Sequence, residues 1–332
     1  MRISLGSLRC NLVGALCLLG TQCFAAEAAG TPSSMASSST ANDITLDEVV
    51  VTVPEPRYVA RTTRDRIGRI WVPVYINDKG PFRLVLDTGA STSAINDEVA
   101  QTLNLPPNQS PDIILRGVTG TAVVPTVTVD SLRVGDLMLR NKRLPIISDA
   151  FGGAVGVLGT EGLADKRIHI DFGSDFVLIR RSNEEPAAPE FYTIPIKFLH
   201  GKVPVAEALM GNMRIKVIID TGLESTVANI AARDALLRQA ATGESTTDEI
   251  IGATMEVQTG ERYLVPSIRM GDIVIRTPHI TFGDMRIFEH WQLLDEPAIL
   301  IGMDAIGTLD VLIIDYKRDE LQIRTRNDQL IK

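Results

Sequence analysis

A short motif that occurs twice constrains this chain more than any other feature of its sequence. Residues 84–91 read Leu-Val-Leu-Asp-Thr-Gly-Ala-Ser, and residues 217–225 read Val-Ile-Ile-Asp-Thr-Gly-Leu-Glu-Ser. Each copy is an apolar run that carries one carboxylate, Asp87 or Asp220, into a tight turn. One Asp-Thr-Gly is a weak signal, because Asp and Gly are ordinary turn residues. Two copies in matching surroundings indicate two equivalent structural units.

The same order of features surrounds both copies. A Val-Pro-Val segment precedes each motif, at residues 72–74 and 203–205. Residues 132–136 and 268–272 both end in Gly-Asp. Farther on, Leu158-Gly159 in the first copy corresponds to Ile301-Gly302 in the second. We infer an internal duplication with a period of about 130 residues, which is far longer than the repeats of solenoid proteins.

Between these landmarks the chain reads as short strands separated by Gly, Asn, Asp and Pro, which predicts an all-β fold. Residues 77–80, Asn-Asp-Lys-Gly, predict a hairpin turn. Asn96 is a candidate cap for a short helix whose inner face carries Val99 and Leu103. The predicted organisation is a leader at 1–25, a flexible tether with a candidate edge strand at 26–66, a first domain at 67–181, a linker at 182–191, a second domain at 192–326 and a tail at 327–332.

The first residues are typical of a secretory signal. Arg2 and Arg9 precede an apolar run at residues 12–20, and small residues follow Cys23. The run is too short to span a bilayer. We therefore expect an exported protein, periplasmic or secreted, without stable membrane insertion after signal cleavage. A lipid anchor at Cys23 is the alternative.

The composition excludes several functions. All three cysteines, Cys10, Cys17 and Cys23, fall in the leader, so the mature chain would have no thiol for catalysis, disulfides or metal binding. The formal charge of −8 makes nucleic acid an unexpected partner. The four histidines show no metal-ligand spacing, so neither a metal nor a cofactor is expected.

These features resemble the aspartic proteases, and most closely the retropepsin-like type. The resemblance covers residues 71–180 and again 194–324. It implies two homologous β-barrel domains in a pepsin-like pseudo-dimer, with the active site at their interface. Retroviral members of the group build this site from two chains and pepsins from one. Because this chain carries both motif copies, it resembles the single-chain arrangement, a monomer acting on a polypeptide substrate.

The resemblance also assigns roles to individual residues. Asp87 and Asp220 would be the catalytic pair, one carboxylate activating a water and the other acting as the acid. Two carboxylates about 3 Å apart cannot both ionise, so the pair holds a single proton. The residues implied to support the catalytic loops are Thr88, Gly89, Ala90, Ser91, Thr221, Gly222, Glu224, Leu158, Gly159, Ile301 and Gly302. Those implied to form the tip of a flap over the substrate are Gly117, Val118, Thr119 and Gly120.

The second copy departs from the first, since Leu223 and Glu224 stand where the first has Ala90 and Ser91. Leu223 would narrow the cleft, and an acid at position 224 would raise the pKa of the pair if it points inward. A second flap near residues 252–260 is less clear in the sequence. Two alternatives to a single-chain endopeptidase stay open. One is a non-catalytic peptide-binding module, and the other is an enzyme active only as a homodimer of its first domain.

Other residues have more ordinary interpretations. Asp171 and Asp315 also end apolar runs, but they lack the following Thr-Gly and are expected in strand-terminal turns. Asp304, after Ile301-Gly302, is also expected in a turn. Trp71 and Trp291 are expected in the core.

Overall fold

The strand β3 (Ile70–Ile76) illustrates how this sequence forms its sheets. Its residues alternate between buried and half-buried positions, as the two-residue period of a strand requires. Asn77 and Asp78 follow with φ of 48° and 58°, the left-handed pair of a two-residue hairpin turn. The strand β4 (Lys79–Leu86) then returns antiparallel to β3 and ends immediately before Asp87. The predicted hairpin at residues 77–80 is therefore present.

The computed structural model describes residues 57–61, 63–64, 68–106, 111–134, 137–148, 152–183, 185–200, 202–239, 244–276 and 279–326. The predicted leader at 1–25, the candidate edge strand at 44–53 and the tail at 327–332 lie outside these residues. We call residues 57–183 the first half and residues 185–326 the second half. The predicted domain and linker boundaries are untested and stay predictions.

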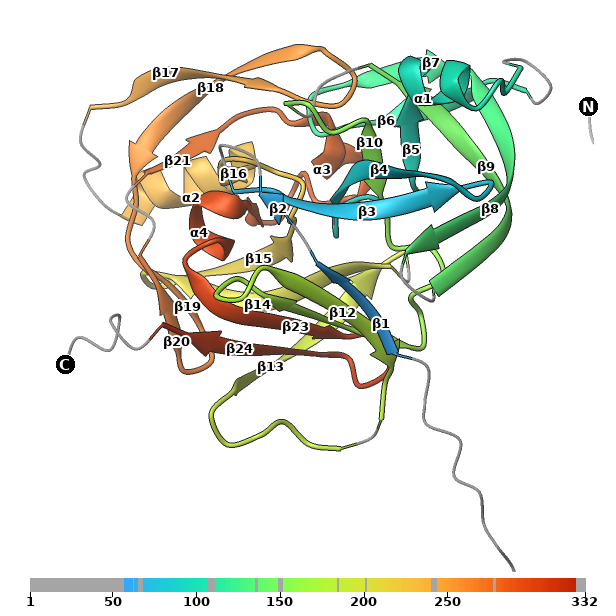
Figure 1. Cartoon of the computed structure of the whole chain (residues 1–332). Coiled ribbons are helices and arrows are strands. Elements are labelled where there is room, and N and C mark those ends of the chain that lie inside the picture. The colour runs from blue at the N-terminus through green and yellow to red at the C-terminus, as the bar shows by residue number, and fades with distance from the viewer. Residues whose placement is uncertain are drawn as a thin grey trace, which may run out of the picture. The chain divides into compact units, whose positions relative to one another are not determined.

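The described residues are mostly strands, with a few short helices (Figure 1). Besides β3 and β4, the first half contains β1 (Arg57–Arg61), β2 (Thr63–Arg64), β5 (Ala94–Asn96), α1 (Asp97–Thr102), β6 (Ile113–Arg116), β7 (Thr121–Val124), β8 (Thr126–Val134), β9 (Leu137–Ile147), β10 (Gly156–Leu158), β11 (Lys166–Asp171) and β12 (Phe176–Arg181). β1 and β2 precede the expected start of structure at residue 67. Asn96 caps α1 as expected, accepting a hydrogen bond from the Val99 amide at 3.1 Å.

The second half follows a closely similar order. It contains β13 (Tyr192–Leu199), β14 (Val203–Met210), β15 (Met213–Ile219), β16 (Val227–Ala228), α2 (Ile230–Gln239), β17 (Thr246–Ile251), β18 (Val257–Leu264), β19 (Ile268–Met270), β20 (Ile273–Ile275), β21 (His279–Phe282), α3 (Arg286–His290), β22 (Ala298–Ile301), α4 (Met303–Ile306), β23 (Leu309–Asp315) and β24 (Glu320–Thr325).

Six strands of the first half close into a barrel. They pair in the order β3, β4, β10, β5, β9 and β8, and β8 pairs again with β3. The β4–β10 and β5–β9 pairs are parallel, and the others are antiparallel. Closure leaves no free edge among these strands. The described residues thus confirm that the fold is mostly β and that it contains a closed barrel.

The same kinds of strand pairing occur in the second half. β15 pairs in parallel with β22, and β16 pairs antiparallel with β22 and parallel with β21. β14 pairs antiparallel with β15 and with β19, as β3 does with β4 and β8. The counterpart of β8, however, is divided into β18 and β19, and the counterpart of β9 is divided into β20 and β21.

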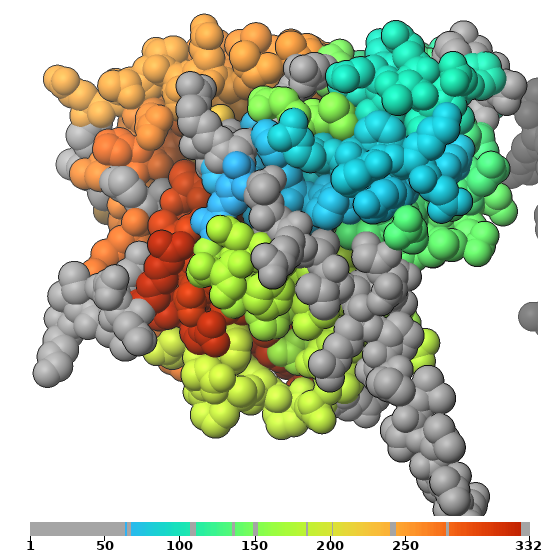
Figure 2. Space-filling model, viewed as in Figure 1, coloured from blue at the N-terminus to red at the C-terminus, as the bar shows by residue number. Residues whose placement is uncertain are grey.

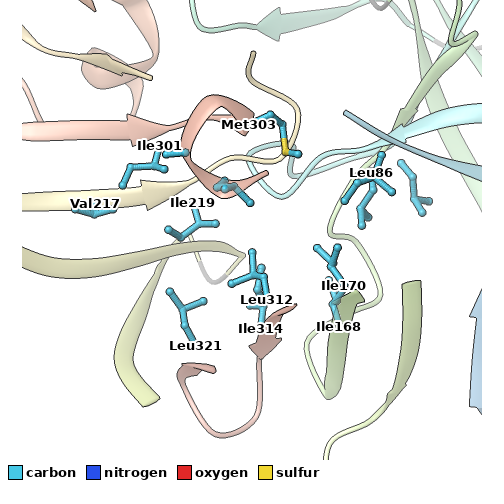
Figure 3. Close-up of a cluster of buried hydrophobic side chains, with 14 of the residues drawn as sticks. Leu86, Ile168, Ile170, Val217, Ile219, Ile301, Met303, Leu312, Ile314 and Leu321 are labelled. Atoms are coloured by element: carbon cyan, nitrogen blue, oxygen red, sulfur yellow. The ribbon is translucent and has the colours of Figure 1, made fainter. Parts of the chain in front are cut away.

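A six-stranded antiparallel sheet joins the two halves, in the order β1, β12, β11, β23, β24 and β13. Its centre is the pairing of β11 with β23, where His169 lies opposite Ile313. Figure 2 shows the lime and red segments that contain these strands in direct contact. Side chains from both halves also share one buried cluster. Figure 3 shows the first-half members Leu86, Ile168 and Ile170 beside Ile219, Ile301, Leu312, Ile314 and Leu321 of the second.

His169 makes this joining sheet sensitive to acid. Burial lowers the pKa of its imidazole to about 4, and the nearby positive charge of Arg167 acts in the same direction. Its Nε2 atom is buried and has no hydrogen-bond partner within the described part of the chain. Arg180 and Arg324 add to the unfavourable charge, and Asp171 opposes it. The neutral imidazole is therefore the form that the folded protein accommodates.

We expect His169 to contribute a decrease in the free energy of unfolding as the pH is lowered from about 6.5 towards 4. In that pH range His169 binds a proton in the unfolded chain but not in the folded chain. Acid therefore favours unfolding by about 1–2 kcal/mol, a value reduced because the imidazole is only partly buried. Urea titrations at several pH values measure this slope. His169→Gln should flatten it, and His279→Gln, at an exposed position, should not. An unchanged slope in His169→Gln would contradict the assignment.

Candidate active site

Asp87 and Asp220 each follow a strand that is held by a parallel neighbour. Leu86 lies opposite Leu158 in the β4–β10 pair, and the Asp87 amide donates to the Leu158 carbonyl at 3.0 Å. Ile219 lies opposite Ile301 in the β15–β22 pair, and the Asp220 amide donates to the Ile301 carbonyl at 3.1 Å. Leu158 and Ile301 therefore hold the two motif loops from behind.

The two halves bring the carboxyl groups of Asp87 and Asp220 into hydrogen-bonding contact with one another. Oδ1 of Asp87 also accepts from the amides of Gly89 and Ala90, at 2.8 and 2.9 Å. Oδ1 of Asp220 accepts from the Gly222 amide at 2.9 Å. Backbone donors thus fix the orientation of both side chains, which were 133 residues apart in the sequence.

The threonines of the two motifs bind across the junction in a reciprocal pattern. The Thr88 hydroxyl donates to the Ile219 carbonyl at 2.7 Å, and the Thr221 hydroxyl donates to the Leu86 carbonyl at 2.7 Å. Each hydroxyl oxygen also accepts the backbone amide of the other threonine at 3.1 Å. Both side chains are completely buried. We call these four hydrogen bonds the threonine lock.

The glycines of both motifs are required by close approach. A Cβ atom on Gly89 would lie 2.6 Å from Oδ2 of Asp220, and one on Gly222 would overlap the carboxyl group of Asp87. Real side chains do not approach so closely, so any larger residue would push the carboxyl groups apart. Each glycine therefore makes room for the carboxylate of the opposite half.

The electrostatic environment differs between the two acids. Burial raises the pKa of Asp220, and the negative charge of Asp87 raises it further, well above the ordinary value for Asp. Burial also raises the pKa of Asp87, but hydrogen bonds from the Ala90 amide and from Asp220, together with the charge of Arg69, oppose that rise. The proton that the pair shares is therefore favoured on Asp220.

A further set of supporting residues was not predicted from the sequence. Ser93 donates its backbone amide to Oε1 of Glu161 at 2.9 Å, and its hydroxyl accepts the Gly159 amide at 3.0 Å. In the second half Thr226 makes equivalent bonds. Its amide and hydroxyl donate to Asp304 at 2.9 and 2.6 Å, and its hydroxyl accepts the Gly302 amide at 3.2 Å.

These bonds tie each motif loop to the strand behind it. The sequence did contain a signal, because Ser93 and Thr226 each lie six residues after their Asp, and an acid lies two residues after each of Gly159 and Gly302. The expectation that Asp304 serves only in a turn was therefore incomplete.

Two hairpins meet over the aspartates, one from each half. The predicted flap tip, residues 117–120, joins β6 to β7, and the second flap joins β17 to β18. Figure 1 shows both hairpins along the same side of the structure. The hydroxyl of the completely buried Thr119 accepts the Gly252 amide at 3.1 Å, and its carbonyl accepts from Gln258 at 3.1 Å. The less clear second flap of the sequence is thus a regular hairpin.

Thr119→Val should loosen this contact, because it removes the acceptor of the Gly252 amide. One such hydrogen bond contributes about 1 kcal/mol, so we expect hydrogen exchange at the Gly252 amide to become up to about 10-fold faster. Exchange measured by NMR or mass spectrometry provides the readout. Thr119→Ser keeps the hydroxyl and should exchange like the wild type. Equal protection in all three proteins would show that the hydroxyl does not hold the hairpins together.

A cavity of about 740 Å³ lies between the hairpins and the two aspartates. Its apolar walls come from both halves. The first half contributes Ala90, Ala94, Leu115, Val118, Ile147 and Val157, and the second half contributes Leu223, Ile250, Ile287 and Trp291. Charged side chains also line it, namely Arg69, Arg116, Glu224, Asp248, Glu249 and Arg262. Trp291 is buried as expected, but it also faces this cavity.

The two positions that differ between the motifs have distinct surroundings. Leu223 is half-buried and packs against the apolar cluster of the second half, so it forms part of the cavity wall. Glu224 lines the cavity and is exposed. Ser91, its counterpart, is also exposed, and its carbonyl accepts from the Lys202 ammonium at 3.3 Å. Of these two counterparts, therefore, only Glu224 adds a charge to the cavity lining.

Residues 72–162 match an aspartyl protease family. The match runs from β3 to the loop after β10, and so includes Asp87 and the first flap. It supports a peptide hydrolase. No curated protein matches the chain. The second half lies outside the family match, and its part in the site rests on the geometry described above.

No helix among the described residues combines the length and the apolar character that crossing a membrane requires. No group of three or more His, Cys, Asp or Glu side chains in that part of the chain is arranged to hold a metal ion.

Proposed function

We propose that this protein is an aspartic endopeptidase whose catalytic pair is Asp87 and Asp220. The observation that carries the proposal is the contact between these two carboxyl groups, held by the threonine lock from both sides. A pure binding module gains nothing from two buried carboxyl groups in contact, because their repulsion has to be offset elsewhere. The family match of residues 72–162 supports the same reaction class.

The proposal includes an internal duplication that forms a pseudo-dimer within one chain. Contacts between residues 133 positions apart support it, since Asp87 touches Asp220, Thr88 touches Thr221, and Thr119 touches Gly252. Residues near a two-fold axis contact their own equivalents in this way. The second half already occupies the position that a second copy of the first half would take. This favours a monomeric enzyme over a homodimer of first domains.

In the proposed mechanism the pair carries one proton, held on Asp220. The ionised Asp87 removes a proton from a water molecule as that water attacks the scissile carbonyl, while Asp220 gives its proton to the carbonyl oxygen. Asp87 then gives its proton to the amine nitrogen as the carbon–nitrogen bond breaks. Asp220 takes a proton from a hydroxyl of the tetrahedral intermediate, which restores the starting pair. Activity requires the singly protonated pair, so it should fall at high pH, where both carboxyls ionise, and at low pH, where both are protonated. The raised pKa of Asp220 extends the pH range of activity towards higher pH.

The substrate of this proposal is an extended polypeptide with apolar side chains on both sides of the scissile bond. The apolar walls from the two halves support this preference, because both line the same cavity as the two aspartates. Entry requires the two hairpins to separate. Export to the periplasm or the exterior is also part of the proposal, and it rests on the predicted leader at residues 1–25.

Cleavage of a diverse peptide library from acidic to neutral pH, followed by mass spectrometry, tests the proposal. We expect cuts between apolar residues and a bell-shaped pH profile. Asp87→Asn should give no cuts, because it removes the base. Equal cleavage by wild type and Asp87→Asn would refute the mechanism. Absence of cleavage by a folded wild-type protein at every pH would favour the binding module.

A further inference from the structure

A second cavity, of about 480 Å³, lies in the second half behind the Asp220 loop. Its apolar lining consists of Ile219, Met270, Ile273, Val274, Ile275, Ile301, Ala305, Ile306, Leu309, Leu312 and Ile323. Its polar lining consists of Arg262, Arg276, His279, Asp304, Thr308 and Thr325. The volume is within the usual range for small-molecule sites. None of the residues proposed for catalysis lines it.

The corresponding position in the first half is filled. There Leu132 lies opposite Leu139 in the β8–β9 pair, and the Leu139 side chain packs so closely on Gly162 that a Cβ there would lie 2.6 Å away. In the second half Ile268 lies opposite Ile275 in the β19–β20 pair. Ile275 is only half-buried, and with Ala305 it lines the open space instead of closing it. The cavity is therefore a specific difference between the halves.

The rim of this cavity carries positive charge. Arg276 and His279 are exposed, and neither has a partner among the described residues. Arg262 pairs with Asp248 at 3.3 Å. The acid in the lining, Asp304, accepts hydrogen bonds from Thr226 and from the Ala305 amide, so its oxygens are already engaged. An apolar interior below an available guanidinium complements a ligand with an apolar body and one anionic end.

We propose that this cavity binds an amphipathic monoanion, specifically a medium-chain carboxylate. The alkyl chain lies among the isoleucines and leucines, where each buried methylene strengthens binding by about 4-fold. The carboxylate pairs with Arg276 at the rim. The ligand also contacts Ile219 and Ile301, the residues opposite each other beneath Asp220, which Figure 3 shows close to Leu312. This binding site goes beyond the proposed function and does not depend on it.

Titration of the protein with sodium decanoate, followed by methyl NMR of isoleucine, tests this proposal. We expect shifts at Ile273, Ile306 and Ile323, which line the second cavity, and none at Ile147, Ile250 and Ile287, which line the cavity over the aspartates. Decanol, which has the same chain without the charge, should bind about 10-fold more weakly. Shifts confined to the aspartate cavity, or the absence of shifts, would overturn the proposal.

Variants distinguish the contribution of the charged rim to ligand binding from that of the apolar interior. Arg276→Gln should weaken decanoate binding about 10-fold and leave decanol binding unchanged. Arg269→Gln, an exposed charge on the neighbouring strand that does not line the cavity, is the matched control and should change neither. Ala305→Leu fills the interior and should weaken both ligands at least 10-fold.

The chain's own end is the competing occupant, because residues 327–332 follow directly after Thr325 and Arg326. Truncation after Arg326 should leave decanoate binding unchanged. Binding that appears only in the truncated protein would overturn the proposal in favour of this segment. Equal effects of Arg276→Gln and Arg269→Gln would also overturn it, because they would indicate non-specific attraction to surface charge.

Discussion

Asp220→Asn is expected to lower kcat/KM for peptide hydrolysis by about 1,000-fold or more. The amide has no acidic proton to give to the scissile carbonyl, and loss of a positioned acid or base generally costs between about 100-fold and 10,000-fold. The carboxyl of Asp220 is buried, in contact with Asp87, and has its pKa raised well above the ordinary value.

The fold should survive this substitution. Asn is isosteric with Asp, and its side-chain oxygen can still accept the Gly222 amide. Replacement of a buried carboxyl by an amide also removes the repulsion from Asp87, so we expect equal or slightly higher stability. Circular dichroism and a urea titration beside the kinetic assay check both points. Asp272→Asn is the control, an exposed acid of the second half that lines neither cavity, and should retain full activity. Substantial hydrolysis by Asp220→Asn would refute the two-aspartate mechanism.

The sequence predicted the parts of this site that depend on local motifs. The two Asp-Thr-Gly turns, the apolar-Gly segments behind them, the helix capped by Asn96 and the first flap were all recognisable, because each depends on a few neighbouring residues. The family resemblance then implied that the two motifs meet. Neither periodicity nor spacing alone would have paired Thr88 with the Ile219 carbonyl.

Other features depended on contacts that no local pattern records. The hydrogen bonds of Glu161 and Asp304 join loops about 70 residues apart, so they are visible only once the barrel is formed. The strand β1 forms because β12 offers it an edge, although residues 57–61 have no strong strand pattern. The second cavity depends on how Ile275 packs, which hydrophobic pattern does not distinguish from the packing of Leu139.

Thr88→Val is expected to lower the free energy of unfolding by about 2–4 kcal/mol. Valine has nearly the same shape, so little packing is lost. It leaves the Ile219 carbonyl without its hydroxyl donor and the Thr221 amide without its acceptor, both in a completely buried place. Each buried polar group that loses its partner costs about 1–3 kcal/mol. Urea unfolding measures the change, and Thr88→Ser, which keeps the hydroxyl, should cost less than 1 kcal/mol.

The reciprocal hydrogen bonds of the threonine lock also predict how the effects of two substitutions combine. If the four hydrogen bonds act as one network, Thr88→Val and Thr221→Val should not be additive, because either change already frees the loops to separate. We expect the double variant to cost about 1 kcal/mol less than the sum of the single variants. Hydrolysis should fall in all three, since the carboxyl groups of Asp87 and Asp220 are held in contact by these loops. Strict additivity, with activity preserved, would mean that the hydroxyls stabilise each half separately and do not join the two halves at the proposed catalytic pair.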